Sequence, residues 1–309
     1  MTYHPEKILE NSSLARTFFE GFEEKTIDVP GGHVFCRVAG EGAPLLLLHG
    51  YPQTSAMWHK IAPTLAQHYR VICADLRGYG RSCKPETDEQ HSPYSKRAMA
   101  NDLIALMDVF GHEKFLVGSH DRGGRVAHRL AYDHSERVLA TAILDIAPTR
   151  EMYANATSAF AAAYWHWYWL IQNAPLPEKL IGTDPDYFWC MKCCSDSAGA
   201  TPFVTQALEE YLDAFRDPET IHSSCEDYRA AYSIDIEHDN AETTKLSTPL
   251  LVNWGKNGAI EAHFDCLKLW RQRATNVQGN SLPGGHYLAE EVPDPVLNAW
   301  LPFFEEHSK

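Results

Sequence analysis

The chain has 309 residues, of which 44% are hydrophobic and 22% charged. This composition is typical of a globular protein with a buried core, and it excludes disordered and fibrous proteins. The longest nearly apolar stretch, 159–171, contains His166 and is shorter than the roughly 20 apolar residues of a membrane-spanning helix.

The acidic charge of the chain limits its partners. Acidic residues number 41 and basic residues 27, which gives a formal net charge of −14, and no cluster of Lys or Arg stands out. We therefore expect neither nucleic acid nor a membrane surface as a partner. The start, Met1-Thr2-Tyr3-His4-Pro5, has neither the basic and apolar regions of a secretion signal nor an Arg-rich transit pattern, so we expect a cytoplasmic protein.

Eight cysteines are scattered along the chain without the spacing of a disulfide framework. Reduced and mostly buried thiols are expected. Cys190 and Cys193 have a Cys-x-x-Cys spacing, but no second pair completes a four-ligand zinc set, so we expect packing in the core and no metal.

Short apolar runs alternate with helical patterns through the first half of the chain. Strands are predicted at 27–29, 33–38, 45–48, 70–74, 114–118 and 138–144, and helices at 58–67, 96–110 and 123–132. The first two strands read as a hairpin around Pro30-Gly31-Gly32. Strands that alternate with helices predict an α/β fold, with a mostly parallel central sheet covered by helices on both faces.

The pattern changes after Pro148. From there to about Ser247 the segments are helical only, and strands return at 249–254 and 276–281, with helices at 262–273 and 295–306. We therefore predict a core domain of residues 1–148 and 248–309, interrupted by a helical cap at 149–247. An insertion of this kind is expected over the carboxyl ends of the strands, where open α/β sheets bind their ligands.

The segment Gly118-Ser119-His120-Asp121-Arg122-Gly123 lies between an apolar strand and a helix. A small residue, a central side chain and a glycine at that junction are typical of a nucleophile elbow, with Asp121 at its centre. Considered alone, the segment fits a helix-capping Asp in a glycine-rich turn equally well.

Two further segments favour the elbow. His49-Gly50-Tyr51-Pro52 follows an early strand, where this architecture places one backbone N–H of an oxyanion hole. The other N–H would come from Arg122, directly after the nucleophile. A glycine-rich turn after the last strand carries His286, which we predict to be the general base.

The acid that orients this histidine has three candidates. Asp145 ends the strand at 138–144 and is the preferred one, while Glu261 and Asp265 follow the next-to-last strand and stay as alternatives. An Asp nucleophile attacks a saturated carbon, displaces a leaving group and forms an alkyl ester on the enzyme. Water activated by His286 would then hydrolyse that ester.

Two arginines close to the nucleophile suggest what the substrate carries. Arg122 and Arg125 can form a local cationic clamp in an otherwise acidic protein, and guanidinium groups fit a carboxylate. A small carboxylic acid is the expected ligand. In the aromatic stripe at 164–169, most members are expected in the core, and His166 and Trp167 are assigned to the site.

These residues resemble the fluoroacetate dehalogenases, the haloacetate dehalogenase group of the α/β-hydrolase superfamily, from about Phe22 to Phe304. The motifs that carry the resemblance are His120-Asp121-Arg122-Gly123-Gly124-Arg125, His166-Trp167, Ala174-Pro175-Leu176-Pro177-Glu178 and Asp227-Tyr228-Arg229-Ala230. The resemblance implies an α/β-hydrolase fold, hydrolysis of a small haloacid such as fluoroacetate to glycolate and fluoride, no cofactor, and a homodimer.

The resemblance also implies roles for individual residues. Asp121, Asp145 and His286 would form the triad, and Arg122 and Arg125 would bind the carboxylate. His166, Trp167 and Tyr228 would hold the departing halide. The chain departs from the family pattern at Ser119, Tyr51 and Trp169 and around 257–262, which bears on substrate range more than on mechanism.

Two other functions share parts of this pattern. Epoxide hydrolases use the same kind of triad with cap tyrosines, for which Tyr211, Tyr228 and Tyr232 are available, but they usually carry Trp directly after the nucleophile. Arg122 at that place favours an anion over a neutral epoxide. A ligand receptor on a hydrolase scaffold is the third hypothesis, and the complete set of Asp121, Asp145 and His286 argues against it.

Overall fold

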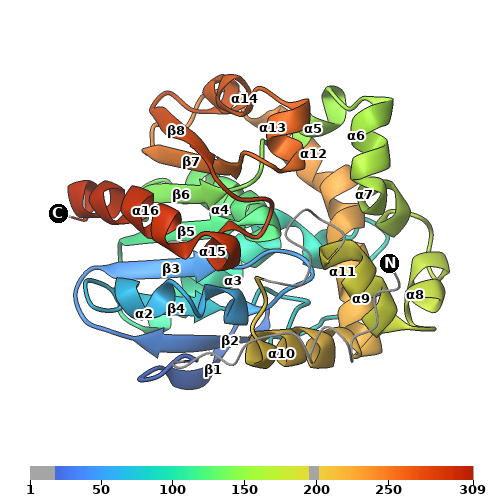
Figure 1. Ribbon diagram of the computed structural model, residues 1–309, viewed down its shortest axis with the longest axis horizontal. Coiled ribbons are helices and arrows are strands. Elements are labelled where there is room, and N and C mark those ends of the chain that lie inside the picture. The colour runs from blue at the N-terminus through green and yellow to red at the C-terminus, as the bar shows by residue number, and fades with distance from the viewer. Residues whose placement is uncertain (1–17, 195–201, 309) are drawn as a thin grey trace.

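The computed structural model describes residues 18–194 and 202–308, which form a twisted sheet flanked by helices (Figure 1). The eight strands follow the order β1-β2-β4-β3-β5-β6-β7-β8. They are β1 Glu23–Val29, β2 Gly32–Ala39, β3 Pro44–Leu48, β4 Arg70–Ala74, β5 Phe115–His120, β6 Val138–Leu144, β7 Leu250–Gly255 and β8 Val277–Leu282. The β1–β2 and β2–β4 pairs are antiparallel, and the pairs from β4 to β8 are parallel, so the predicted fold class is confirmed.

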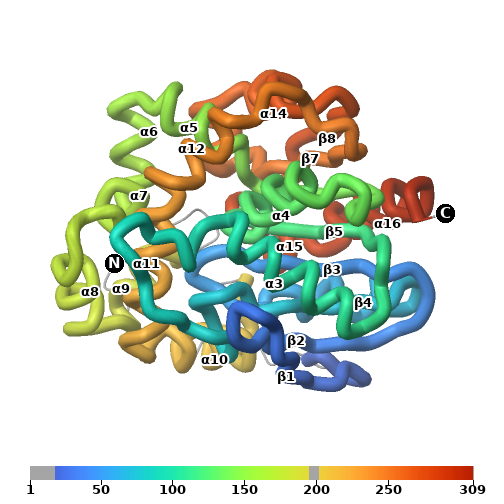
Figure 2. Tube along the Cα trace, turned by 180° about the vertical axis from the view of Figure 1, so that it is seen from behind, coloured from blue at the N-terminus to red at the C-terminus, as the bar shows by residue number. Residues whose placement is uncertain are grey.

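Helices cover both faces of this sheet. The helices α15 Leu288–Glu291 and α16 Pro293–His307 lie in front of the sheet in Figure 1, and α3 Lys96–Val109 and α4 Asp121–Asp133 lie in front in the reverse view of Figure 2. This explains why β3 and β5 are buried along nearly their whole length, since a strand covered on both faces can be apolar throughout.

Between β6 and β7 the chain is helical. The helices there are α5 Thr149–Ala154, α6 Ser158–Ala163, α7 Trp165–Leu170, α8 Leu176–Ile181, α9 Pro185–Cys193, α10 Thr205–Phe215, α11 Pro218–Tyr232 and α12 Ile234–Ala241. We call this part the α5–α12 segment. Figure 1 shows α7, α9 and α11 beside the end of the sheet at which β3 and β5 finish.

Two helices predicted from the sequence are broken in the structure. The predicted helix 58–67 is a 3-10 turn, η1 Ser55–Trp58, followed by α2 Ala62–Leu65. Pro63 stands in the first turn of α2, and because proline has no N–H to donate, a helix from Trp58 cannot run through it.

The predicted helix 262–273 is also two helices, α13 Ala259–His263 and α14 Cys266–Arg273. Phe264 is extended between them, and the Asp265 carboxylate accepts a hydrogen bond from the Lys268 N–H. An Asp cap of this kind starts a new helix, which the periodicity of the apolar residues did not reveal.

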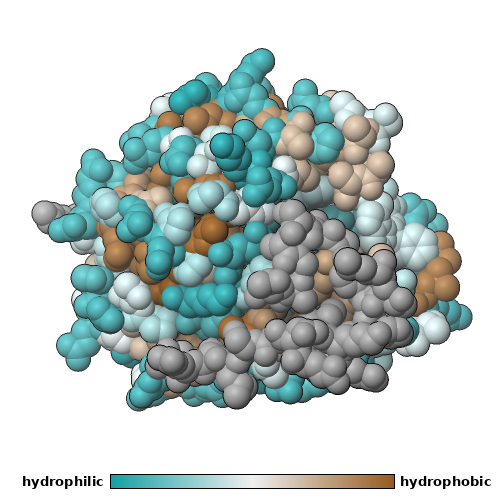
Figure 3. All heavy atoms as spheres, viewed as in Figure 1, coloured by the Kyte–Doolittle hydropathy of each residue, from teal (hydrophilic) through white to brown (hydrophobic). Residues whose placement is uncertain are grey.

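All eight cysteines are buried, as expected. Within the part of the chain that the structure describes, no helix combines the length and the apolar character needed to cross a membrane. Hydrophilic side chains cover much of the described surface in Figure 3, and a hydrophobic group at its right lies over α8, which exposes Leu176 and Leu180.

The candidate active site

Asp121 occupies the turn between β5 and α4. Its φ of 44° is in the left-handed region, which a side chain other than glycine adopts only where the surroundings impose it. Two glycines make room for the turn: a Cβ on Gly123 would lie 2.4 Å from the Leu48 carbonyl oxygen, and one on Gly50 would lie 2.6 Å from the Asp121 Cβ. The sharp turn predicted from the small residues is therefore present.

The two oxygens of the Asp121 carboxylate have different surroundings. Oδ1 accepts a hydrogen bond of 2.9 Å from the Tyr51 N–H, while Oδ2 lies 4.0 Å from Nε2 of His286. Burial acts to raise the pKa of Asp121, but the nearby charges of His286, His120 and the two arginines outweigh it and lower the pKa to about 2. The carboxylate is therefore ionised at neutral pH, with Oδ2 facing the histidine.

Asp145 is the carboxylate that lies against His286. Its Oδ2 is 2.6 Å from Nδ1 of the ring, and its Oδ1 accepts a hydrogen bond of 2.8 Å from the Gly255 N–H. The alternatives are engaged elsewhere, since Glu261 accepts a hydrogen bond from the Trp254 indole and Asp265 caps α14.

The protonation of His286 is set by opposing effects. Burial acts to lower its pKa, whereas the hydrogen bond and charge of Asp145 and the charge of Asp121 raise it, and the net result is a pKa above the ordinary value of 6.5. A ring held by a carboxylate at Nδ1 presents Nε2 toward Asp121, which is the orientation that a general base needs.

Arg122 is buried and forms an ion pair with Asp227, a residue to which the sequence assigned no role of its own. Its Nε and Nη2 donate to Oδ2 and Oδ1 of Asp227 at 2.8 and 2.7 Å, and Nη2 also donates to the Asp227 carbonyl oxygen. Asp227 is also paired with Lys96. The signal that could have found Asp227 is its place directly before Tyr228, a predicted site residue.

Arg125 is different, because within the described ranges no carboxylate oxygen lies within 4 Å of its guanidinium. Only 3% of the residue is exposed, so it does not face solvent. Nη1 donates to the Thr149 hydroxyl at 2.8 Å, and Nε has no hydrogen-bond partner among the described residues. Burial and the charge of Arg122 lower its pKa. A buried cation of this kind is a ready binding place for an anion.

Three buried donors complete the site. His166 Nδ1, Trp167 Nε1 and the Tyr228 hydroxyl are inaccessible to solvent and lack hydrogen-bond partners in the part of the chain described. The Trp167 and Tyr228 rings lie 4.6 and 4.2 Å from the guanidinium carbons of Arg125 and Arg122, respectively. Buried polar groups are normally paired, so these three donors are available to a ligand.

Most of the aromatic stripe at 164–169 packs in or against the core, as expected. His166 and Trp167 are buried, and the partly buried side chains that pack against the core are Tyr164, Tyr168 and Trp169. Trp165 differs from them, because 42% of it is exposed.

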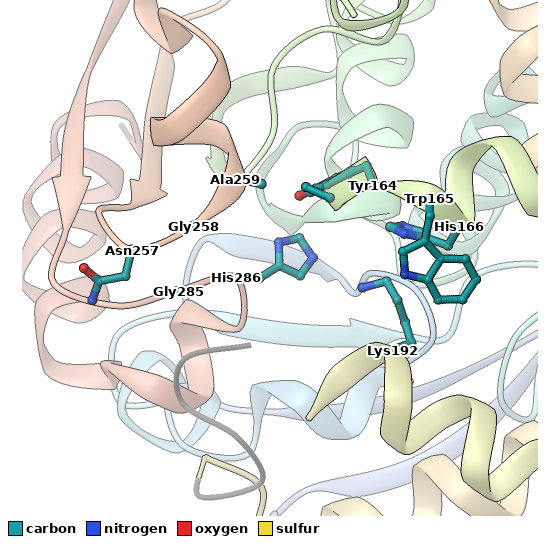
Figure 4. A pocket seen from close by; sticks show the side chains of 10 residues that line it. Tyr164, Trp165, His166, Lys192, Asn257, Gly258, Ala259, Gly285 and His286 are labelled. Carbon is teal, nitrogen blue, oxygen red and sulfur yellow. The ribbon is translucent and has the colours of Figure 1, made fainter. Parts of the chain in front are cut away.

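A small cavity lies beside this group of residues. It has a volume of about 120 Å³ and is lined by Ala163, Tyr164, Trp165, His166, Lys192, Asn257, Gly258, Ala259, Gly285 and His286 (Figure 4). We call it the mouth cavity. It is far smaller than the roughly 300–1,000 Å³ of pockets for drug-sized ligands, so it suits a small molecule.

A metal ion has one candidate place among the described residues, formed by Glu178, His222 and Glu226 on α8 and α11. Arg229 already pairs with both carboxylates, at 2.7 and 2.6 Å. The cluster contains none of the predicted site residues, so nothing connects it to the triad.

The tyrosines considered for an epoxide hydrolase are not equivalent. Tyr232 is 52% exposed, and the Tyr211 hydroxyl donates to Glu290 at 3.1 Å. Tyr228 has a buried hydroxyl without a described partner. The pair of free phenols that ring opening of an epoxide would recruit is therefore not formed by these three residues.

The relatives found among known proteins agree with the fold described above. Residues 43–293 match the family described as alpha/beta hydrolase fold. The chain is 47% identical to a fluoroacetate dehalogenase of Burkholderia sp, with 93% of this chain and 95% of that protein covered. It is 33% identical to a soluble epoxide hydrolase of Corynebacterium sp. (strain C12), with 86% and 91% covered.

One solved structure is about as similar to this chain in sequence as the Burkholderia protein. The crystal structure of a protein from Nostoc sp PCC 7120 has a TM-score of 0.90 and 49% sequence identity, and the match covers 93% of this chain and 99% of that one.

Proposed function

Because the chain belongs to the alpha/beta hydrolase fold family, we propose that it hydrolyses the carbon–halogen bond of a small 2-haloacid, fluoroacetate foremost, to the hydroxy acid and halide. The observation that carries this proposal is Arg125, a buried guanidinium beside the reacting carboxylate and without a carboxylate of its own among the described residues. A carboxylate substrate would neutralise it, whereas a neutral epoxide or alkyl halide would leave the charge buried and unpaired.

In the first step, Oδ2 of Asp121 attacks the halogen-bearing carbon and forms an ester, and the halide leaves with the bonding electron pair. The low pKa of Asp121 keeps this nucleophile ionised. Fluoride is strongly hydrated, so its departure requires donors that replace water. The unpaired Nδ1 of His166, indole of Trp167 and hydroxyl of Tyr228 are suited to this task.

In the second step, Nε2 of His286 takes a proton from water, and the resulting hydroxide attacks the Asp121 Cγ. The negative charge develops on Oδ1, which already accepts the Tyr51 N–H. The Arg122 N–H is the second donor that we propose for this oxygen. The bond from Cγ to Oδ2 then breaks, and the hydroxy acid leaves with that oxygen and the proton of His286.

The α5–α12 segment supplies His166, Trp167 and Tyr228, so we propose that residues 149–247 act as a cap over a core of 1–148 and 248–309. The homodimer implied by the family resemblance is likewise a prediction. Light scattering on the purified protein tests it, and a mass of about 35 kDa would contradict it.

The function is tested by measuring free fluoride with an ion-selective electrode after mixing the enzyme with fluoroacetate. We expect sustained release, and none from the Asp121→Asn variant. A single turnover with excess enzyme in ¹⁸O-labelled water should leave the label in the Asp121 carboxylate and none in the first glycolate. Turnover of epoxides without any halide release would instead assign the chain to the epoxide hydrolases.

A further inference from the structure

The mouth cavity borders the catalytic base. Its lining includes His286 and His166 but neither Asp121 nor the two arginines, so a ligand in it would lie beside the site without contacting the nucleophile. The lining comes from the α5–α12 segment on one side and from core loops on the other (Figure 4).

Lys192 carries the one permanent charge among the residues that line this cavity. It belongs to α9 and is partly buried. Figure 4 shows its amine extending toward the space between His286 and His166. Among the described residues, no carboxylate oxygen lies within 4 Å of the ammonium nitrogen, so none of them forms an ion pair with Lys192.

The field of Lys192 reaches both histidines of the site. Burial lowers the pKa of His166 most, and the charge of Lys192 is the next contribution in the same direction. For His286 the charge of Lys192 is a smaller contribution, after burial, Asp145 and Asp121. The ammonium group therefore acts on the interior of the site as well as on its entrance.

We propose that Lys192 attracts the carboxylate of the substrate into the mouth cavity, before the substrate passes to Arg125. This inference rests on the proposed function, because it needs an anionic substrate. A chain with a formal net charge of −14 repels anions at long range, so a local cation at the entrance raises the frequency of productive encounters.

A lysine suits this task better than an arginine would. Its ammonium group is compact, strongly hydrated and carried on a flexible stem, so it attracts an anion without holding it in a fixed bidentate pair. The Arg125 guanidinium deeper in the site can then bind the carboxylate.

The experiment compares kcat/KM for fluoroacetate in the wild type, Lys192→Met and Lys192→Arg at low and high ionic strength. We expect Lys192→Met to lose about tenfold at low salt, as for a steering charge. The loss should shrink below about twofold at 1 M salt, where the Debye length is about 3 Å. Lys192→Arg should retain most of the wild-type rate, since it keeps the charge.

The matched control is Lys179→Met, which removes the same charge from an exposed position on α8. It should stay near the wild type at every salt concentration. A loss in Lys192→Met that persists unchanged at high salt, or an equal loss in Lys179→Met, would overturn the proposal.

A failure of the proposed function is recognised separately. Binding of glycolate, the proposed product, can be measured without any reaction. Its association rate can be followed by tryptophan fluorescence, because Trp165 and Trp167 lie at the site. If the wild type releases no fluoride, the proposed function is wrong, and Lys192 is judged on this association rate. An equal rate in the wild type and Lys192→Met at low salt would then disprove its role.

Discussion

Asp227 holds the guanidinium of Arg122 by two charged hydrogen bonds, whereas Arg125, one turn further along the same helix, has no carboxylate partner in the described structure. Arg122 is therefore fixed and electrically balanced before any ligand binds. The charge of Arg125 is available to pair with an anionic ligand. Two arginines that look equivalent in the sequence thus have different tasks, and each leads to a different prediction.

Replacing Asp227 by Asn should destabilise the protein strongly. The change leaves Arg122 buried without its counter-charge and Lys96 with Asp235 as its remaining partner, and breaking a buried pair in this way costs about 3–5 kcal/mol. Urea denaturation measures the free energy of unfolding. The control is Asp186→Asn, which breaks the more exposed pair with Arg216 and should cost no more than about 1 kcal/mol. Equal losses of unfolding free energy in the two variants would contradict a special contribution of the buried Asp227 pair to stability.

Replacing Arg125 by Met should stabilise the fold while it impairs the reaction. The lowered pKa of Arg125 means that the folded protein disfavours its charged form, chiefly through burial, so removal of the charge relieves that cost. We therefore expect the free energy of unfolding to rise, because Met removes a buried charge that has no carboxylate partner among the described residues. The value of kcat/KM for fluoroacetate should fall by at least about 100-fold, since the substrate carboxylate loses a buried charged partner.

The outcome that would disprove this role of Arg125 is unchanged kcat/KM together with unchanged inhibition by acetate. Lys in place of Arg125 keeps the charge but not the planar fork, so it should restore only part of the activity.

Replacing His286 by Asn should separate the two chemical steps. Asp121 keeps its free Oδ2 and can still form the ester, but no base activates the water. Intact-protein mass spectrometry after incubation with fluoroacetate should therefore show a stable adduct with the mass of a carboxymethyl group. A folded variant that never forms this adduct would mean that His286 acts in the first step as well.

The pH dependence should differ between the two kinetic parameters. His286 must be neutral to accept a proton from water, so kcat should fall as the pH drops through its raised pKa when hydrolysis of the ester limits turnover. Ester formation needs ionised Asp121, whose pKa is about 2, so kcat/KM should persist to lower pH. Parallel acid limbs for both parameters would contradict the assignment of His286 to the second step only.

Glu290 gives a prediction about stability. Burial raises its pKa to about 8 from the ordinary 4.5, against the opposing effects of Lys60, Gln53 and Tyr211. The folded state then binds a proton that the unfolded state releases, so the free energy of unfolding falls as the pH rises from 4.5 through about 8. Replacement by Gln, which is always neutral, should raise the melting temperature at pH 8 more than at pH 5. An equal shift at both pH values would contradict this linkage.

The sequence by itself determined the parts of this protein that depend on local pattern. Alternating strands and helices require a parallel sheet, and the carboxyl ends of its strands bring together residues that directly follow them. Asp121 and Asp145 both follow strands, and His286 lies in a turn soon after the last one, so their meeting could be predicted although 141 residues separate Asp145 from His286.

Only the tertiary structure decided which buried cations form ion pairs with carboxylates. Arg122 and Asp227 are 105 residues apart, and Lys192 reaches the mouth cavity from another helix of the α5–α12 segment. The periodicity of the sequence does not predict which of these cations pairs with a carboxylate. The energy of a buried charge depends on what surrounds it in space, and packing of distant segments sets those surroundings.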